Sequence, residues 1–259
     1  MMKKIIIIII ASIILFGCGS GSIVRQSSIV NPIKETPAPI NSNIQSAVTP
    51  VPESTTLPDK IDLSMPFYSQ APLANWDALH NDACEEAAAL NVTHFLDGNK
   101  VDNNQIDQEI IRMVDWENNY WGMQYDLSIA NVKEMVDVYF NNKYQTHIVE
   151  NITIDEIKQS IALGAPVIVP LSGRTINNPN FTGLGPVYHM IVIRGYDDNK
   201  QEFITNEVGT RKGDGYRYNY NVLFDSMHDM PKWQQTKNML DSDPSMIFAG
   251  AKSVLIITK

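Results

Sequence analysis

Hydrophobic residues recur at helical spacing in the first half of the region that begins at residue 61. The segments with this pattern are 84–96, 104–116, 128–140 and 154–163. Apolar residues three and four positions apart lie on one face of a helix, which can bury that face against a core. Thr153 is suited to cap the start of the last segment, and Gly164 is suited to end it. We therefore predict four helices.

The pattern changes after residue 164. Short segments rich in β-branched and aromatic residues follow one another between Gly, Pro, Asp and Asn: 165–171, 188–197, 202–207, 216–220 and 253–259. Such segments are typical of strands, and the turn "DDNK" predicts that the second and third form a hairpin. Helices first and an antiparallel sheet second predict an α+β fold.

The N-terminus has the features of a secreted protein. Two lysines precede an apolar run from Ile5 to Phe16, which is too short to span a bilayer comfortably and suits a signal peptide. Leu15, Gly17 and Cys18 resemble the lipobox of bacterial lipoproteins. The resemblance implies that residues 1–17 are a signal peptide and that Cys18 is lipidated, which would anchor the protein outside the cytoplasm on the bacterial membrane. An ordinary signal peptide or an uncleaved anchor is the alternative.

Residues 18–60 contain many Pro, Ser, Thr and Asn residues and no aromatic residue. A segment of this composition cannot bury enough apolar surface to offset the entropy lost on ordering. We interpret it as a disordered tether, followed by one domain over residues 61–259. A structured N-terminal arm is the other reading.

Charge and cysteine content narrow the function classes. The formal net charge is −9, and no basic cluster exceeds Arg211-Lys212, so we do not expect a nucleic acid partner. The chain has two cysteines, and lipidation of Cys18 would leave Cys84 without a disulfide partner. A lone extracytoplasmic thiol is expected to be either buried or used.

Cys84 lies in "NDACEEAAAL", where a helix is predicted to begin. With Asp82 as N-cap, Glu85 falls at the third helical position, an arrangement like a capping box, and the thiol lies near the positive end of the helix dipole. The dipole favours a thiolate, whereas Asp82, Glu85 and Glu86 oppose it, so a separate base is needed. The alternative is a small buried residue among alanines.

His189 is the candidate base. In its strand, alternation places His189, Ile191 and Ile193 on one face and Met190, Val192 and Arg194 on the other. A core histidine is the alternative. Asn206 or Glu207, on the next strand, is placed to orient the imidazole, and the Gln70 amide is a candidate oxyanion donor beside the Cys84 N–H.

These residues lie in motifs that resemble a known family. The motifs are "MPFYSQAPLANWDALHNDACEEAAAL", "MVDWENNYWG", "GAPVIVPLSGR", "YHMIVIRGYDD" and "FITNEVGTRKGDGYRYNY". Together they are similar to the bacterial C39-like (papain-like) cysteine peptidase domain, over nearly all of residues 61–259. The resemblance implies a papain-like α+β fold, with Cys84 as nucleophile, His189 as base and Gln70 in the oxyanion hole.

The sequence departs from that family at two places. Asn206-Glu207-Val208 stands where the family commonly has Asn-Asp-Pro, so the triad acid by register is Glu207, with Asn206 as substitute. Gln70 precedes Cys84 by 14 residues, a longer gap than in papain itself.

Other candidate sites are weaker. The remaining histidines show no metal-ligand spacing, and residues 97–109 have Asp102 where a calcium loop needs glycine, so we predict no metal and no cofactor. Arg174 precedes the His189 strand and is placed either to contact a substrate carboxylate or to cap a strand end.

The sequence therefore predicts a membrane-anchored thiol hydrolase of peptide or isopeptide bonds. Two alternatives stay open: a surface binding module on a decayed peptidase fold, and a hydrolase of cell-wall peptides. The cell-wall peptidases of the related NlpC/P60 type usually carry Asp-Cys-Ser-Gly at the nucleophile, where this chain has Asp82-Ala83-Cys84-Glu85. The sequence leaves the oligomeric state open.

Overall fold

A twisted antiparallel sheet forms the centre of the structure, a computed structural model that describes residues 56–231, 240 and 242–259. Its strands run in the order β2-β7-β3-β4-β5-β6, and β1 pairs with β4 outside this path. The strands are β1 (Lys60–Asp62), β2 (Gln145–Val149), β3 (Val167–Leu171), β4 (His189–Asp197), β5 (Glu202–Asn206), β6 (Asp214–Asn219) and β7 (Val254–Thr258). The predicted hairpin is present as β4 and β5.

All four predicted helices are present. They are α2 (Cys84–Asp97), α3 (Asn103–Tyr120), α4 (Ile129–Tyr139) and α5 (Ile154–Ala162). Thr153 caps α5 in a capping box with Glu156, as its position predicted. The periodicity did not predict α1 (Ala78–Asn81), α6 (Tyr220–Ser226), the 3₁₀ helix η1 (Pro244–Ala249), β1 or β2. Helix α6 starts at Tyr220, one residue inside the segment that we predicted as strand 216–220.

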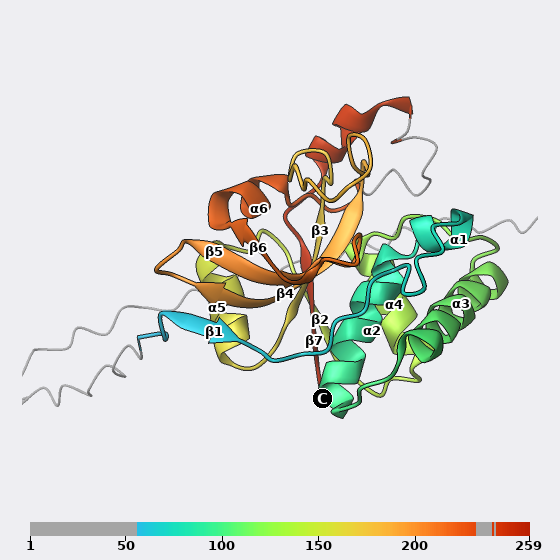
Figure 1. The fold of residues 1–259 in the computed structure, drawn as a ribbon, viewed down its shortest axis with the longest axis horizontal. Coiled ribbons are helices and arrows are strands. Elements are labelled where there is room, and N and C mark those ends of the chain that lie inside the picture. Colours follow the sequence, from blue (N-terminus) through green and yellow to red (C-terminus); the bar gives the residue numbers. More distant parts are fainter. Residues whose placement is uncertain (1–55, 232–239, 241) are drawn as a thin grey trace, which may run out of the picture. The chain divides into compact units, whose positions relative to one another are not determined.

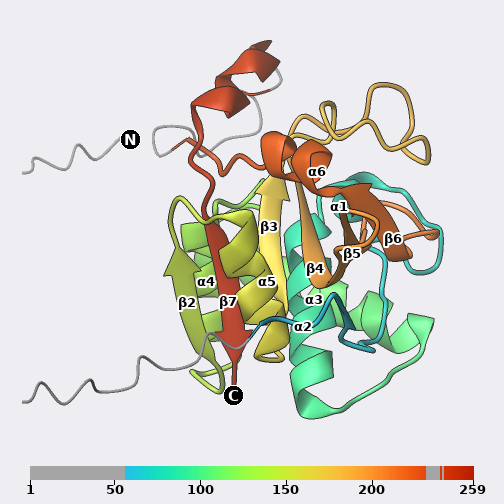
Figure 2. The same cartoon turned by 90° about the vertical axis from the view of Figure 1, so that its left-hand side faces the viewer.

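All strand pairs of the sheet are antiparallel, which confirms the predicted α+β architecture, and helices cover both faces of this sheet. Helices α2 and α4 pack on one face and α5 on the other (Figures 1 and 2). Two hydrophobic cores result, and the strands supply alternate residues to each. Strand β3 is buried at every residue because neither of its faces meets solvent.

Strand β4 contributes to both cores in the predicted alternation. Met190 and Val192 lie in the core on the α2 side, whereas Ile191 and Ile193 lie in the core on the α5 side. His189, the first residue of β4, is at the strand end where the central sheet meets the start of α2. The sheet and helix α2 therefore bring residues 84 and 189 to the same end of the domain.

A buried polar contact fixes α2 against the sheet. Asn91, which is fully buried in α2, accepts a hydrogen bond from the Asn206 side chain at 2.8 Å and another from the Tyr68 N–H at 3.0 Å. Its own amide donates to the carbonyls of Tyr68 and Ala87. Four satisfied hydrogen bonds at one buried amide hold the helix, the 65–68 segment and β5 in register.

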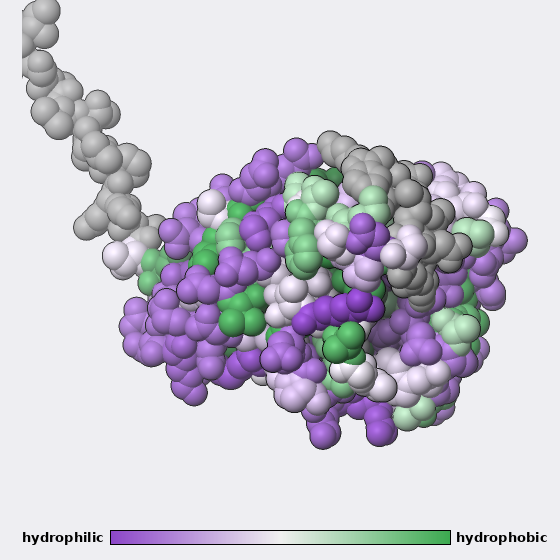
Figure 3. Space-filling view, turned by 90° about the horizontal axis from the view of Figure 1, so that it is seen from above, coloured by the Kyte–Doolittle hydropathy of each residue, from purple (hydrophilic) through white to green (hydrophobic). Residues whose placement is uncertain are grey.

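The predicted signal peptide, Cys18 and nearly all of the predicted tether lie outside the described residues. Ordered contacts reach slightly before residue 61, because the Tyr196 hydroxyl donates to the Pro58 carbonyl at 2.8 Å. No helix in the described ranges has the length and apolar character needed to cross a membrane. Seen from above, the surface is mostly hydrophilic, with small separate hydrophobic areas (Figure 3).

Candidate active site

Cys84 is the first residue of α2, but the helix is not capped as the sequence predicted. The N-cap is Ala83, whose side chain makes no capping bond, and Asp82 instead ends helix α1. Glu85 turns into the protein, where it is fully buried and its Oε1 accepts the Leu127 N–H at 3.0 Å. The capping-box interpretation was wrong because α1 is a separate turn that already uses Asp82.

The thiol of Cys84 is held in its protonated form. It donates to Glu85 Oε2 at 3.0 Å and is only 4% exposed. Burial raises its pKa well above the usual value, and the carboxyls of Glu85 and Asp126 raise the pKa further. These effects oppose the helix dipole and favour the thiol form of Cys84, so a separate base would be needed to produce a thiolate.

His189 and Glu207 form a buried pair. The Nε2 atom of His189 lies 2.6 Å from Glu207 Oε1, and the two side chains are 2% and 0% exposed. Oε1 of Glu207 also accepts the Gly209 N–H at 2.9 Å, and Oε2 accepts the Tyr218 hydroxyl at 2.7 Å. Because Nε2 is directed at the carboxylate, Nδ1 is the ring nitrogen left to accept a proton from another group.

Asn206 faces away from His189. Its amide donates to Asn91 and to the Pro66 carbonyl at 2.7 Å, and its Oδ1 accepts from Arg194 at 2.9 Å. Adjacent residues of an extended chain point to opposite sides, so placing Asn206 on the α2 side directs Glu207 to the histidine. Of the two candidates, Glu207 contacts the imidazole and Asn206 supports the fold.

Gln70 lies beside Cys84 with its amide engaged elsewhere. Its Nε2 donates to the carbonyls of His80 and Asn81 at 2.8 and 3.0 Å, which uses both amide hydrogens. Two carbonyl acceptors fix this orientation of the amide. The residue therefore holds α1 next to the nucleophile, and its part in an oxyanion hole stays a prediction.

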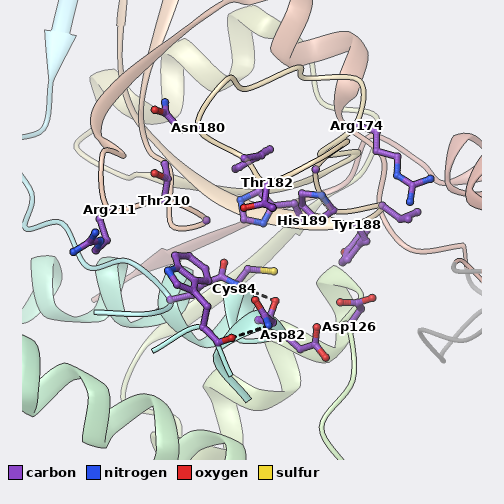
Figure 4. A pocket seen from close by; sticks show the side chains of 18 of the residues that line it. Asp82, Cys84, Asp126, Arg174, Asn180, Thr182, Tyr188, His189, Thr210 and Arg211 are labelled. Atoms are coloured by element: carbon purple, nitrogen blue, oxygen red, sulfur yellow. Dashed lines mark hydrogen bonds between the residues drawn. The ribbon is translucent and has the colours of Figure 1, made fainter. Parts of the chain in front are cut away.

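A cleft of about 820 Å³ joins these groups. Cys84, His189 and Gln70 all line it, and Figure 4 shows the Cys84 and His189 side chains at the same cavity. One wall is formed by loops of the sheet, residues 172–188 and 207–213, and the other by the start of α2 and residues near 126. The structure thus brings the predicted nucleophile Cys84 and the predicted base His189 to one cleft, with Glu207 in contact with the base.

The sequence model of the Peptidase_C39 like family matches residues 62–240. The chain belongs to this family. A comparison with curated proteins found no match.

Two solved structures are similar to this member of the C39-like family. A putative C39-like peptidase from Bacillus anthracis is 14% identical, with 77% of this chain and 98% of that chain covered and a TM-score of 0.45. Xylellain, a cysteine protease from Xylella fastidiosa, is 16% identical, with 81% and 90% covered and a TM-score of 0.40.

Sequence reasoning missed Tyr218 and Asn178, which shape this C39-like site. Tyr218 donates to Glu207 and accepts from Asn178 at 2.6 Å, and Phe181 packs edge-on against the His189 ring at 5.4 Å between centroids. Tyr218 is one of the alternating aromatics of 216–220, which predicted a strand but not which hydroxyl would reach the site. Asn178 lies in a loop, where no periodicity indicates contacts.

Among the described residues no group of His, Cys, Asp and Glu is arranged to hold a metal ion. His80 and His94 instead contact the carboxyls of Asp107 and Glu109, at 3.2 and 2.7 Å.

Gly209 leaves room for the His189 ring, which leads to a testable prediction. A Cβ at this position would lie 2.9 Å from both Cε1 and Nε2 of His189 and 3.0 Å from Phe181. We expect Gly209→Ala to displace the imidazole and to lower the kcat/KM of any Cys84-dependent hydrolysis by about 10- to 100-fold. Steady-state kinetics checks the result, with a thermal melt to show that the variant is folded.

The control is Gly122→Ala, at a glycine with φ +92° where a Cβ would have nothing within 4 Å. This change strains the backbone but leaves the site alone, so activity should be unchanged in the folded fraction. Full activity in Gly209→Ala would show that the ring tolerates the displacement.

Proposed function

We propose that this protein is a membrane-anchored extracytoplasmic cysteine peptidase that hydrolyses peptide or isopeptide bonds through Cys84. The observation that carries the proposal is the buried His189–Glu207 pair, 2.6 Å apart, on the same cleft as the thiol. Membership of the C39-like family supports a peptidase-type reaction.

In the proposed reaction, His189 acts as a general base. Its Nδ1 takes the proton from Cys84, and the sulfur forms a bond to the substrate carbonyl carbon. The carbonyl oxygen becomes an oxyanion beside the Cys84 N–H, which has no intrahelical partner because it lies in the first turn of α2. The imidazolium then gives its proton to the leaving nitrogen as the C–N bond breaks. Water next attacks the thioester carbonyl while His189 takes a proton from it, and the C–S bond breaks as that proton returns to the Cys84 sulfur.

The environment of the thiol makes proton transfer part of the attack. Burial and the neighbouring carboxyls raise the pKa of Cys84, which disfavours a preformed thiolate. Glu207, held by Gly209 and Tyr218, stabilises the imidazolium at the moment when His189 accepts the proton. We therefore expect slow alkylation of the resting thiol at neutral pH and fast acylation by bound substrate.

The same thiol contact favours the second candidate, a binding module on a decayed peptidase fold. In the described structure the Cys84 hydrogen bond is to Glu85 and not to His189. A thiol that never leaves this contact would make the cleft a binding site without turnover.

Acyl-enzyme trapping separates the two candidates. The full chain is mixed with short activated peptide esters, quenched in acid and analysed by intact mass. We expect one acyl group on Cys84, lost in Cys84→Ala and slowed at least 100-fold in His189→Ala. His147→Ala, an exposed histidine on β2, is the control and should match the parent. No acylation with any ester would leave the binding module, and release of products from peptidoglycan fragments alone would favour a cell-wall hydrolase.

The membrane anchor is tested separately. We expect the full chain, expressed in a bacterium, to sediment with membranes and Cys18→Ala to become soluble, because acyl chains would supply most of the membrane affinity. Cys84→Ala is the matched cysteine control and should remain with membranes. Cys18→Ala that still sediments with membranes would count against lipidation.

A further inference from the structure

Unpaired cations gather at the candidate cleft of this acidic protein. Arg174, Arg211 and Lys212 line the cleft and are exposed, although the chain has a formal net charge of −9. Within the described part of the chain, no carboxylate forms an ion pair with any of the three side chains, and the one hydrogen bond of Lys212 is made by its backbone N–H to the Thr210 hydroxyl.

Most other cations of the domain are paired. The ion pairs are Lys60–Asp197, Lys133–Asp137, Lys143–Asp97, Lys158–Asp198, Arg194–Asp62, Arg217–Glu202 and Lys259–Asp97. In a protein with an excess of acidic groups, a cation without a partner is the exception. Three such side chains on one cleft place several positive charges where a bound anionic group could reach them.

The positions of the cations relative to the nucleophile suggest how a substrate would lie. In Figure 4, Arg211 lies on one side of His189, and Arg174 lies on the other side near Tyr188. Both come from loops of the sheet, whereas Asp82 and Asp126 lie on the opposite wall, close to Cys84. The middle of the cleft is therefore unfavourable for an anionic group, and its two ends favour one.

We propose that the cleft selects peptides that carry carboxylates flanking the bond presented to Cys84, one bound by Arg174 and another by Arg211 and Lys212. Guanidinium groups match the planar carboxylate and can bind it with two parallel hydrogen bonds. The peptide residues at the centre of the cleft are expected to be neutral, because Asp82 and Asp126 would repel an acidic side chain there. As a preference for the bond that is cleaved, this specificity rests on the proposed peptidase function. Binding of the carboxylates to the cleft does not require turnover.

The test measures binding, so that it does not depend on catalysis. The probe is a pool of short fluorescent peptides of neutral residues in which one flanking position is Glu or Gln, and the protein is the full chain carrying Cys84→Ala. By fluorescence anisotropy at low salt we expect the Glu pool to bind about five- to tenfold more tightly than the Gln pool. The difference should shrink as salt is added, because the cations are exposed.

Variants assign the preference to the two ends of the cleft. Arg174→Gln should abolish it at one flank, and the double change Arg211→Gln with Lys212→Gln should abolish it at the other. Arg211→Glu with Lys212→Glu should transfer the preference to Lys peptides. Lys100→Gln and Lys200→Gln remove exposed cations that do not line the cleft, and both should keep the Glu preference.

Peptides with a C-terminal acid or a C-terminal amide distinguish the source of the carboxylate. A Glu preference that survives amidation identifies an acidic side chain, and one found only in the free acid identifies a chain terminus. Equal binding of Glu and Gln pools, or a preference that persists in every cleft variant, would overturn the inference. Hydrolysis with no Glu preference would overturn the proposed carboxylate preference and leave the peptidase function intact. A Glu preference without acylation would support the carboxylate preference and count against the peptidase function.

Discussion

Glu207→Gln is expected to lower kcat/KM about a hundredfold while leaving the fold and KM nearly unchanged. The Gly209 N–H fixes an oxygen at the Oε1 position, so the glutamine would still accept a hydrogen bond from His189 Nε2. The change therefore removes the negative charge and keeps the tautomer, and the imidazolium formed during attack loses its main stabilising partner. Steady-state kinetics checks the result, with a thermal melt to show that the variant is folded.

The matched control for this prediction is Glu202→Gln, the same chemical change at the other end of strand β5. Glu202 pairs with Arg217 and lies outside the cleft, so activity should stay within about twofold of the parent. Glu207→Asp shortens the side chain by one methylene and should fall between parent and Glu207→Gln, since it cannot reach both His189 and Tyr218. Parental activity in Glu207→Gln would show that the carboxylate serves the fold alone.

The fold was largely predictable because its main elements are long and strongly patterned. Helices α2 to α5 show apolar residues at helical spacing, and β3 and β4 are short β-branched segments that bury both faces. The missed elements lack these signals. Strand β2 ("QTHIV") is mostly exposed, and α1 is a single turn whose residues satisfy no apolar period. Their conformations depend on pairing with β7 and on hydrogen bonds from Gln70, which local sequence does not encode.

The candidate site was predictable in its residues but not in its electrostatics. Residue order and family resemblance pointed to Cys84 and His189, and register pointed to Glu207. The choice between Asn206 and Glu207 required the neighbours of Asn206, because only Asn91 and Arg194 show which side it faces. The protonated state of the thiol could not be predicted, because it depends on burial and on the position of Glu85. The sequence suggested that Glu85 caps the helix, whereas its carboxyl accepts a hydrogen bond from the sulfur.

Helices α2 and α3 contribute a pair of buried carboxyls. Glu86 of α2 and Glu117 of α3 are 1% and 0% exposed, and they lie close enough for the charge of Glu117 to raise the pKa of Glu86. Within the described residues no group donates a hydrogen bond to either oxygen of Glu117. A buried carboxyl without a donor, next to a second buried carboxyl, favours a proton on the pair, because two adjacent buried carboxylates would repel.

This pair makes the stability of the folded protein fall as pH rises. Burial raises the pKa of Glu117 from 4.5 to about 8, and burial with the Glu117 charge raises the pKa of Glu86. Between pH 4.5 and about pH 8, the folded state keeps a proton on Glu117 that the unfolded state has released. The free energy of unfolding therefore decreases as pH rises through this range. From about pH 5 to about pH 8 we expect a loss of roughly 2–4 kcal/mol, measured by urea unfolding of the full chain.

Glu117→Gln should flatten that pH dependence and leave the variant more stable than the parent at about pH 8. The amide cannot take up a proton in this pH range and can donate a hydrogen bond to Glu86, so folding takes up fewer protons than in the parent. Asp115→Asn, an exposed change in the same helix, is the control and should follow the parent curve. Asp229, whose pKa burial raises to about 6, contributes to the slope in all three proteins, so the pair is measured by the difference between variant and parent. Parallel curves for Glu117→Gln and the parent would mean that the two glutamates share no proton.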